Sequence, residues 1–147
     1  MAVKKNDRGE SAVQFLDTAR QLEDYTLDYC MKLPKRYTFF LSLDLVRLSK
    51  DIYNNAKAAN SVYPQNPEEA QIRINYVIYA IVAAEQLASQ LDIAMNRIHE
   101  FAKTDKDGNP KQIKPKVWEE WARLVLTEIR LLKALKKSLQ GKYNIKE

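Results

Sequence analysis

Glycine and proline are rare in this chain, and their positions divide it into four long stretches. Because these two residues interrupt helices and strands, a stretch without them can form one long regular element. The breakers are Gly9, Gly108, Gly141, Pro34, Pro64, Pro67, Pro110 and Pro115. The stretches between them cover about residues 10–33, 35–60, 67–102 and 115–140. Each is several times longer than an ordinary strand of about six residues, so the chain is predicted to form four helices.

Apolar and small residues recur every three or four positions in all four stretches, which places them on one face of a helix. No stretch shows the period of two that a half-buried strand requires. Four long helices with mostly short links pack best as an antiparallel up-down four-helix bundle. The predicted all-α core contains Phe15, Ala19, Leu22, Thr26, Tyr29 and Leu33; Tyr37, Leu41, Leu45, Leu48, Ile52, Ala56 and Ala59; Ile74, Val77, Ile81, Ala84, Ala88, Leu91, Met95 and Ile98; and Trp118, Trp121, Val125, Ile129, Leu132, Leu135 and Leu139.

Capping signals predict where the helices begin and end. Ser11 with Gln14 resembles a capping box, in which two side chains satisfy free backbone N–H groups reciprocally. Asn66 is a typical N-cap, and Pro67 suits the first helical position, where its missing N–H costs nothing. Gly141 is predicted to stop the last helix because glycine readily adopts the left-handed conformation.

The chain is predicted to hold a single domain over residues 11–140. It has 147 residues, of which 46% are hydrophobic, and this suffices for one core. Residues 1–10 are expected to be a flexible N-terminal segment without a signal peptide's apolar region, and residues 141–147 a C-terminal tail. The longest apolar run, Tyr76–Ala84, has nine residues, well short of the roughly 20 that span a bilayer. A cytoplasmic protein without membrane contact is therefore expected.

Residues that carry catalytic chemistry are scarce. His99 is the only histidine, so several imidazoles cannot meet on one metal within one chain. Asn96 stands where a Glu-x-x-His metal motif would need glutamate. Cys30, the only cysteine, has no histidine nearby to activate its thiol, and no two glycines lie close enough for a phosphate-binding loop. The chain is predicted to be no enzyme, with no cofactor and no metal.

Positive charge is concentrated in the last quarter of the chain. The net charge is +5, but residues 111–147 carry ten basic against four acidic residues, whereas residues 68–102 carry two against five. Arg123, Arg130 and Lys137 recur every seven residues, hence on one helical face, and Lys133 and Lys136 flank that row. A basic row of this kind is typical of phosphate contact. A merely solvated face remains the alternative.

A short motif and the order of the helices resemble a known family. Leu33-Pro34-Lys35-Arg36-Tyr37 opens an amphipathic helix that ends at Ala58-Ala59-Asn60, an acidic-capped helix follows, and the last helix is rich in leucine and lysine. This is similar to the four-helix-bundle family of the accessory variability determinant (Avd) of diversity-generating retroelements. The same family contains proteins encoded in intervening sequences of large-subunit rRNA genes.

The resemblance implies a non-catalytic accessory protein of mutagenic reverse transcription. It implies a pentamer that binds the reverse transcriptase and template RNA or cDNA through basic surfaces. The alternatives are a scaffolding helical oligomer and an rRNA-associated protein without a retroelement role. The candidate nucleic-acid-binding residues are Lys35, Arg36, Arg47, Lys50, Arg123, Arg130, Lys133 and Lys137.

Self-association is also expected from the residues alone. Some apolar residues broaden the second and fourth stripes beyond what a bundle core needs, and exposed apolar patches mark interfaces. These residues are Phe39, Phe40, Leu43, Val46, Leu124, Leu126 and Leu131.

Overall fold

The computed structural model describes residues 2–100 and 114–146, and this part of the chain is helical without any strand. The four long helices confirm the all-α prediction. Two short turns precede the second of them. In chain order the elements are α1 (Ala2–Lys32), the 3-10 turn η1 (Lys35–Tyr37), the π turn η2 (Thr38–Ser42), α2 (Leu43–Ser61), α3 (Pro67–Glu100) and α4 (Pro115–Lys142).

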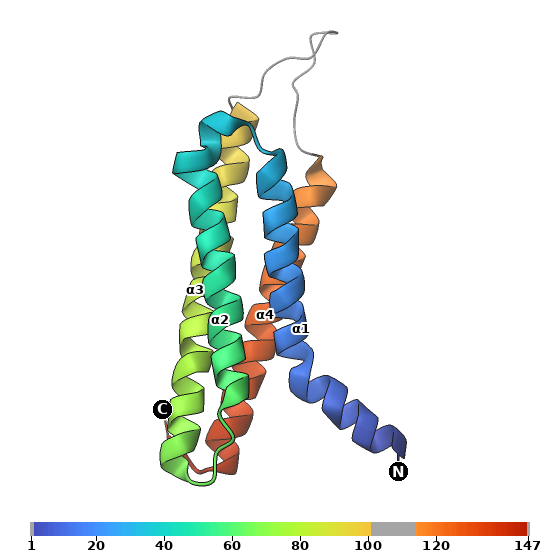
Figure 1. Cartoon of the computed structure of the whole chain (residues 1–147), viewed down its shortest axis with the longest axis vertical. Helices are drawn as coiled ribbons and strands as arrows, with labels where there is room; N and C mark the ends of the chain where they lie inside the picture. The colour runs from blue at the N-terminus through green and yellow to red at the C-terminus, as the bar shows by residue number, and fades with distance from the viewer. Residues whose placement is uncertain (1, 101–113, 147) are drawn as a thin grey trace.

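Each long helix packs mainly against two others. Both α1 and α3 contact α2 and α4, so α2 and α4 lie across the bundle from each other. Consecutive helices run in alternate directions along the long axis (Figure 1). The arrangement is compatible with the up-down topology that short connections favour.

The residues that the helical periodicity selected fill the core. Leu22 and Thr26 on α1, Leu45 and Ile52 on α2 and Trp121 on α4 have no measurable exposure. The whole second stripe is buried. In the third stripe Ala88 is partly buried and Met95 is exposed, with 36% of its surface accessible. The α3 core also takes in Ala70, Ala80, Ala83, Leu87 and Ala94, which lie beside the predicted row.

The start of α3 confirms the predicted cap. The backbone N–H of Glu69 donates to Asn66 Oδ1 at 2.9 Å, and Asn66 Nδ2 donates to Glu69 Oε1 at 3.2 Å. The Gln65 N–H also donates to that carboxylate at 3.4 Å. These reciprocal bonds satisfy N–H groups that have no partner within the helix.

Two predicted helix ends are wrong. The first helix begins at Ala2, so Ser11 lies inside α1 and is not an N-cap. Gly141 does not stop α4, which continues to Lys142. The left-handed residue is Asn144, with φ 53°, and the Ile145 N–H donates to the Gln140 carbonyl at 2.9 Å. This is a Schellman motif with asparagine at the position where glycine is more common.

The second helix does not run as one α-helix from Lys35. Pro34 is extended, with ψ 142°, and its carbonyl accepts from the Tyr37 N–H at 3.0 Å, which closes a 3-10 turn. The π turn follows, and in it the Leu43 N–H reaches back to the Thr38 carbonyl. A π turn widens the helix by one residue per turn and is frequent at functional sites.

The domain limits stay predictions, although α1 includes residues 2–10 and α4 passes residue 140. The first part of α1 points away from the other helices (Figure 1). Residues 103–114, between the third and fourth predicted helices, are expected from the sequence to form a polar connection, and they lie almost wholly outside the described residues.

One helix, α3, is long and apolar enough from Pro67 to Ile98 to cross a membrane by length and composition alone. The count of uninterrupted apolar residues overlooked this. A core helix of a bundle passes the same test, and α3 has a buried row along much of its length.

Candidate nucleic-acid interface

The predicted basic row on α4 faces solvent. Arg123, Arg130, Lys133 and Lys137 are all exposed, and Lys136 is partly buried. Successive members of the seven-residue row lie about 10 Å apart along the axis at 1.5 Å per residue. Alternate phosphates of a nucleic-acid strand have comparable separations, so the row can follow a backbone.

Four of the candidate cations, Arg47, Lys50, Arg123 and Lys133, have carboxylate partners among the described residues. Arg47 lies between Asp44 and Asp51, with nitrogen–oxygen distances of 3.8 and 3.4 Å. Lys50 Nζ lies 3.2 Å from Glu23 Oε1 on α1. These carboxylates offset the positive potential of α2. Arg47 and Lys50 are therefore weaker phosphate ligands than their charge alone suggests.

Arg123 is held by its own helix. Its Nε donates to Glu120 Oε2 at 2.8 Å, and a second guanidinium nitrogen donates to the other carboxylate oxygen. The hydrogen bond from Arg123 lowers the pKa of Glu120, so the carboxylate stays ionised near neutral pH. The first member of the predicted row is thus largely neutralised.

Three lysines at the C-terminal half of α4 line one groove. Lys133, Lys136 and Lys137 border a hollow of about 830 Å³ between α3 and α4. Its remaining walls come from the α3 residues Ile78, Ile81 and Val82 and from Gln140, Gly141 and Ile145. Lys133 Nζ lies 3.4 Å from Glu85 Oε1 at the edge of α3, whereas Lys136 and Lys137 make no ion pair with any described residue. We call these three lysines and the hollow the lysine groove.

The predicted set of basic residues does not form one patch. Lys133 and Lys137 lie beside α3, whereas Arg47 and Lys50 lie on α2, which is across the bundle from α4. Lys35 belongs to η1, near the opposite end of the long axis from the lysine groove (Figure 1). Sequence periodicity identified each basic face but not which helices would be neighbours.

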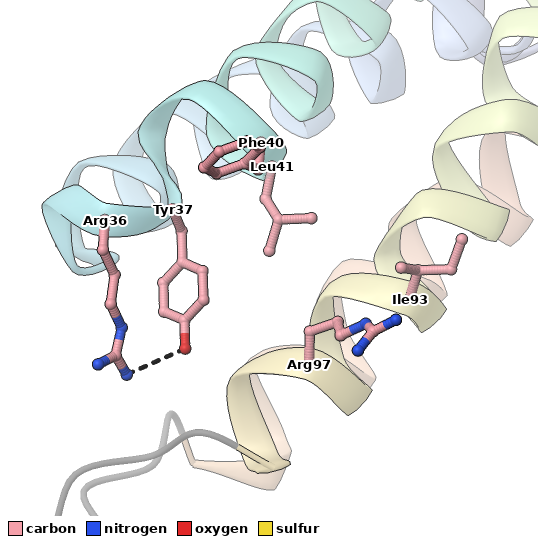
Figure 2. A pocket seen from close by; sticks show the side chains of 6 residues that line it. All are labelled: Arg36, Tyr37, Phe40, Leu41, Ile93 and Arg97. Carbon is pink, nitrogen blue, oxygen red and sulfur yellow. Dashed lines mark hydrogen bonds between the residues drawn. The ribbon is translucent and has the colours of Figure 1, made fainter.

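A second, mostly apolar hollow lies at the η1 end of the bundle. Its volume is about 490 Å³, and Figure 2 shows Tyr37, Phe40 and Leu41 facing Ile93 and Arg97 of α3 across it. Arg36, at its edge, donates to the Tyr37 hydroxyl at 3.0 Å. Arg36 and Arg97 also have further interactions. Sequence patterns did not single out Arg97, because its place in the lining of this hollow depends on how α3 packs against the residues before α2.

Side chains for nucleophilic or metal chemistry do not gather in the described part of the chain. No group of three or more His, Cys, Asp or Glu residues there could hold a metal ion. Cys30 is buried, and burial raises the pKa of its thiol to about 11. The side chain of His99 lies outside the described residues.

The fold and the surface define a class: a four-helix all-α protein with a lysine-lined groove on one side. Comparison of the chain with protein-family models, curated protein sequences and solved structures finds no match. The family resemblance therefore stays a prediction from the residues.

Proposed function

We propose that this protein is a non-catalytic accessory protein that binds nucleic acid through the lysine groove. The observation that carries the proposal is the convergence of Lys133, Lys136 and Lys137 on one hollow between α3 and α4. Three ammonium groups in one groove attract a phosphate backbone more strongly than the same charges spread around the bundle. Lys136 and Lys137 make no ion pair with a described residue, which leaves their charge available to phosphate.

The groove favours the nucleic-acid backbone over base edges. Lysine provides a point charge rather than the fork geometry that reads guanine. The α3 wall is aliphatic, formed by Ile78, Ile81 and Val82, and aliphatic side chains do not supply the stacking platforms of base-binding sites. We therefore expect weak sequence preference and strong salt dependence.

The biological setting is proposed from the family resemblance. The four helices would form an antiparallel up-down bundle that self-associates and supports mutagenic reverse transcription in a diversity-generating retroelement. Its partners would be the reverse transcriptase and template RNA or cDNA, in the cytoplasm and away from membranes. A neighbouring reverse-transcriptase gene with a pair of near-identical repeats would support this setting.

A scaffolding oligomer is the second candidate function. The observation that favours it is the pairing of Arg47, Lys50, Arg123 and Lys133 with carboxylates. Such pairs are what a solvated helical surface shows when it has no polyanion to bind. An rRNA-associated protein without a retroelement role would share this surface.

Charge reversal at matched positions tests nucleic-acid binding. The variant K136E/K137E changes the groove, and R20E/K57E makes the same change of net charge on α1 and α2. Both are titrated with a fluorescent single-stranded RNA by anisotropy at several salt concentrations, after circular dichroism confirms that helicity is unchanged.

The groove variant should lose at least tenfold in affinity and flatten the dependence of affinity on salt, whereas the control should change affinity little. Equal losses in both variants would indicate non-specific attraction. Failure of the wild type to bind at low salt would favour the scaffold.

A further inference from the structure

The solvent face of α3 carries a row of residues without any charge. Its members alternate in steps of three and four along the helix, and every one of them is exposed. The apolar members are between 44% and 57% exposed. We call this row the outer seam: Ile72, Asn75, Tyr79, Val82, Gln86, Ser89, Ile93 and Asn96.

The outer seam differs from the exposed faces of the other helices. Exposed positions of α1 include Asp17, Arg20, Asp24 and Asp28, and those of α4 include the basic row. On α2 they include Asp44, Arg47, Lys50 and Lys57. A heptad spacing over about 25 residues is the pattern of a helix-packing surface. The buried row of α3 already contacts α2 and α4, so the outer seam is a second packing surface that no part of the described chain covers.

The order of residues along the seam is symmetric about Val82. Residues equally far from Val82 on either side, to within one position, have matching chemistry. The pairs are Ile72 with Ile93, Asn75 with Ser89, Tyr79 with Gln86, and at the two ends Glu68 with Arg97. Ile72 therefore matches Ile93, Asn75 matches Ser89 as a hydrogen-bonding group, and the Tyr79 hydroxyl matches the Gln86 amide. Glu68 and Arg97, which lie just beyond the ends of the seam, match as an acid and a base, whereas Asn96 has no counterpart within the seam.

We propose that the outer seam binds the same seam of a second copy of this chain, antiparallel, with a two-fold axis at Val82. In that register Val82 meets Val82, and Ile72 of each copy meets Ile93 of the other. Glu68 then lies opposite Arg97 at both ends. A two-fold contact requires such self-complementarity, because residue i contacts j and j contacts i.

The charges on the exposed helix faces favour the outer seam over the basic face of α4 as the contact between two copies. An antiparallel two-fold pairing of α4 would bring Arg123, Arg130 and Lys137 against the same cations of the second copy. Like charges facing each other in an interface cost free energy. The members of the outer seam carry no charge themselves, and depletion of charge is typical of interface centres.

A second copy also explains the polar members of the seam better than a bilayer does. Asn75, Gln86 and Ser89 can donate and accept hydrogen bonds with equivalent groups on an identical face. Hydrocarbon offers no such partners. This inference rests on the self-association in the proposed function, but it gives an even number of chains, in contrast to the pentamer that the resemblance implies.

Sedimentation equilibrium of the full chain with a charge-swap pair tests the contact. The wild type should sediment at twice the 17.1 kDa chain mass. In V82E two carboxylates meet across the axis, and in V82K two ammonium groups meet, so each variant alone should sediment at 17.1 kDa. An equimolar mixture of the two should recover the two-chain mass. L126E, at a 62%-exposed leucine on α4, tests the apolar face of α4 that the sequence also marks for self-association, and it should leave the mass unchanged.

Cysteine cross-linking tests the direction of the two helices. The buried Cys30 does not interfere, as the wild type under the same mild oxidation will show. V82C should form a disulfide-linked dimer, whereas L126C should not. I72C and I93C should each stay unlinked, because like positions lie about 30 Å apart in this register, but their mixture should link.

Several results would overturn the inference. They are a wild-type mass of one chain at micromolar concentration, a mass of five chains, no recovery in the V82E and V82K mixture, or self-linking of I72C. RNA titration of I72E separates the two proposals, because Ile72 belongs to the outer seam but not to the lysine groove, whose wall includes Val82. I72E places a carboxylate against Ile93 of the second copy and should sediment as one chain. If I72E is a monomer that still binds RNA, the seam and the groove act independently. If the wild type pairs but binds no RNA, only the proposed function fails.

Discussion

The indole Nε1 of Trp121 donates a hydrogen bond of 2.9 Å to the Thr26 hydroxyl inside the core between α4 and α1. The Thr26 hydroxyl in turn donates to the Leu22 carbonyl at 2.7 Å. The preceding residue on α1, Tyr25, donates its hydroxyl hydrogen to the Val117 carbonyl at 2.7 Å, and Val117 lies one turn before Trp121 on α4. The rings of Tyr25, Tyr29, Trp118 and Trp121 pack against one another here. The hydrogen bonds satisfy polar groups that this packing would otherwise leave buried and unpaired. They also fix the register in which the two helices meet.

Removing the Thr26 hydroxyl should destabilise the fold without changing core volume. In T26V the indole N–H of Trp121 loses its acceptor while remaining buried, which costs about 1–3 kcal/mol. Urea denaturation followed by circular dichroism measures the change in the free energy of unfolding. T127V, at a partly exposed threonine on α4, is the control and should change stability by less than about 0.5 kcal/mol. Equal stability of T26V and wild type would show that the bond contributes nothing.

Glu128 should make the fold less stable as pH rises. It is completely buried on α4, and neither carboxyl oxygen has a hydrogen-bond partner among the residues that the structure describes. Burial raises the pKa of Glu128 from 4.5 to about 9. Between these values the folded chain holds a proton that the unfolded chain has lost. The free energy of unfolding contributed by this group therefore falls by about 1.4 kcal/mol per pH unit.

Replacement of Glu128 tests this pH dependence. E128Q cannot ionise, so its unfolding free energy should fall less steeply than that of the wild type across pH 5 to 9. E128L, which removes the buried polar group altogether, should be more stable than the wild type at pH 7. Urea denaturation at each pH gives both quantities. Parallel wild-type and E128Q curves would show that Glu128 does not titrate in this range.

The left-handed residue after α4 should tolerate glycine but not a branched side chain. Asn144 has φ 53°, which glycine adopts without strain and a β-branched residue does not. N144V should lose about 1–2 kcal/mol of stability, and N144G should match or exceed the wild type. Thermal unfolding compares the two. Equal losses in both would mean that the asparagine side chain, not the backbone conformation, is what matters.

Periodicity predicted the core because each buried row follows one helix, as Leu45 and Ile52 illustrate. It missed Glu128, although Glu128 lies three residues after Val125 and four before Leu132, directly on the buried stripe. Charged residues usually mark solvent, and only packing shows that this one is enclosed. The outer seam was present in the sequence too, but its exposure depends on which face of α3 the neighbouring helices cover.

The candidate site was only partly predictable for a related reason. Spacing placed Lys133 and Lys137 on one face of the last helix, and the structure adds the α3 wall that makes this face a groove. Arg47 and Arg123 pair with acids three or four residues away on the same helix. This spacing can be seen in the sequence, so these two ion pairs were predictable. The Lys50–Glu23 pair joins two helices and depends on their register, which a linear pattern does not contain.

Neutralising Glu120 should tighten nucleic-acid binding if the α4 row contacts phosphates. In E120Q the guanidinium of Arg123 loses its carboxylate partner and becomes available to a phosphate in line with Arg130 and Lys137. The change also removes one negative charge near the row. Affinity should therefore rise. The slope of log affinity against log salt concentration should also become steeper, by up to about 0.7 to 0.9 for one added phosphate contact.

The neighbouring Glu119 supplies the control for this effect. It is exposed on the same turn of α4 and makes no ion pair with a described residue, so E119Q changes net charge equally without releasing Arg123. Anisotropy titrations with single-stranded RNA at four or more salt concentrations compare the slopes. A steeper slope in E120Q alone would place Arg123 in the phosphate-binding row. Equal slopes in both variants would limit the interface to the lysine groove and leave Arg123 as a surface ion pair.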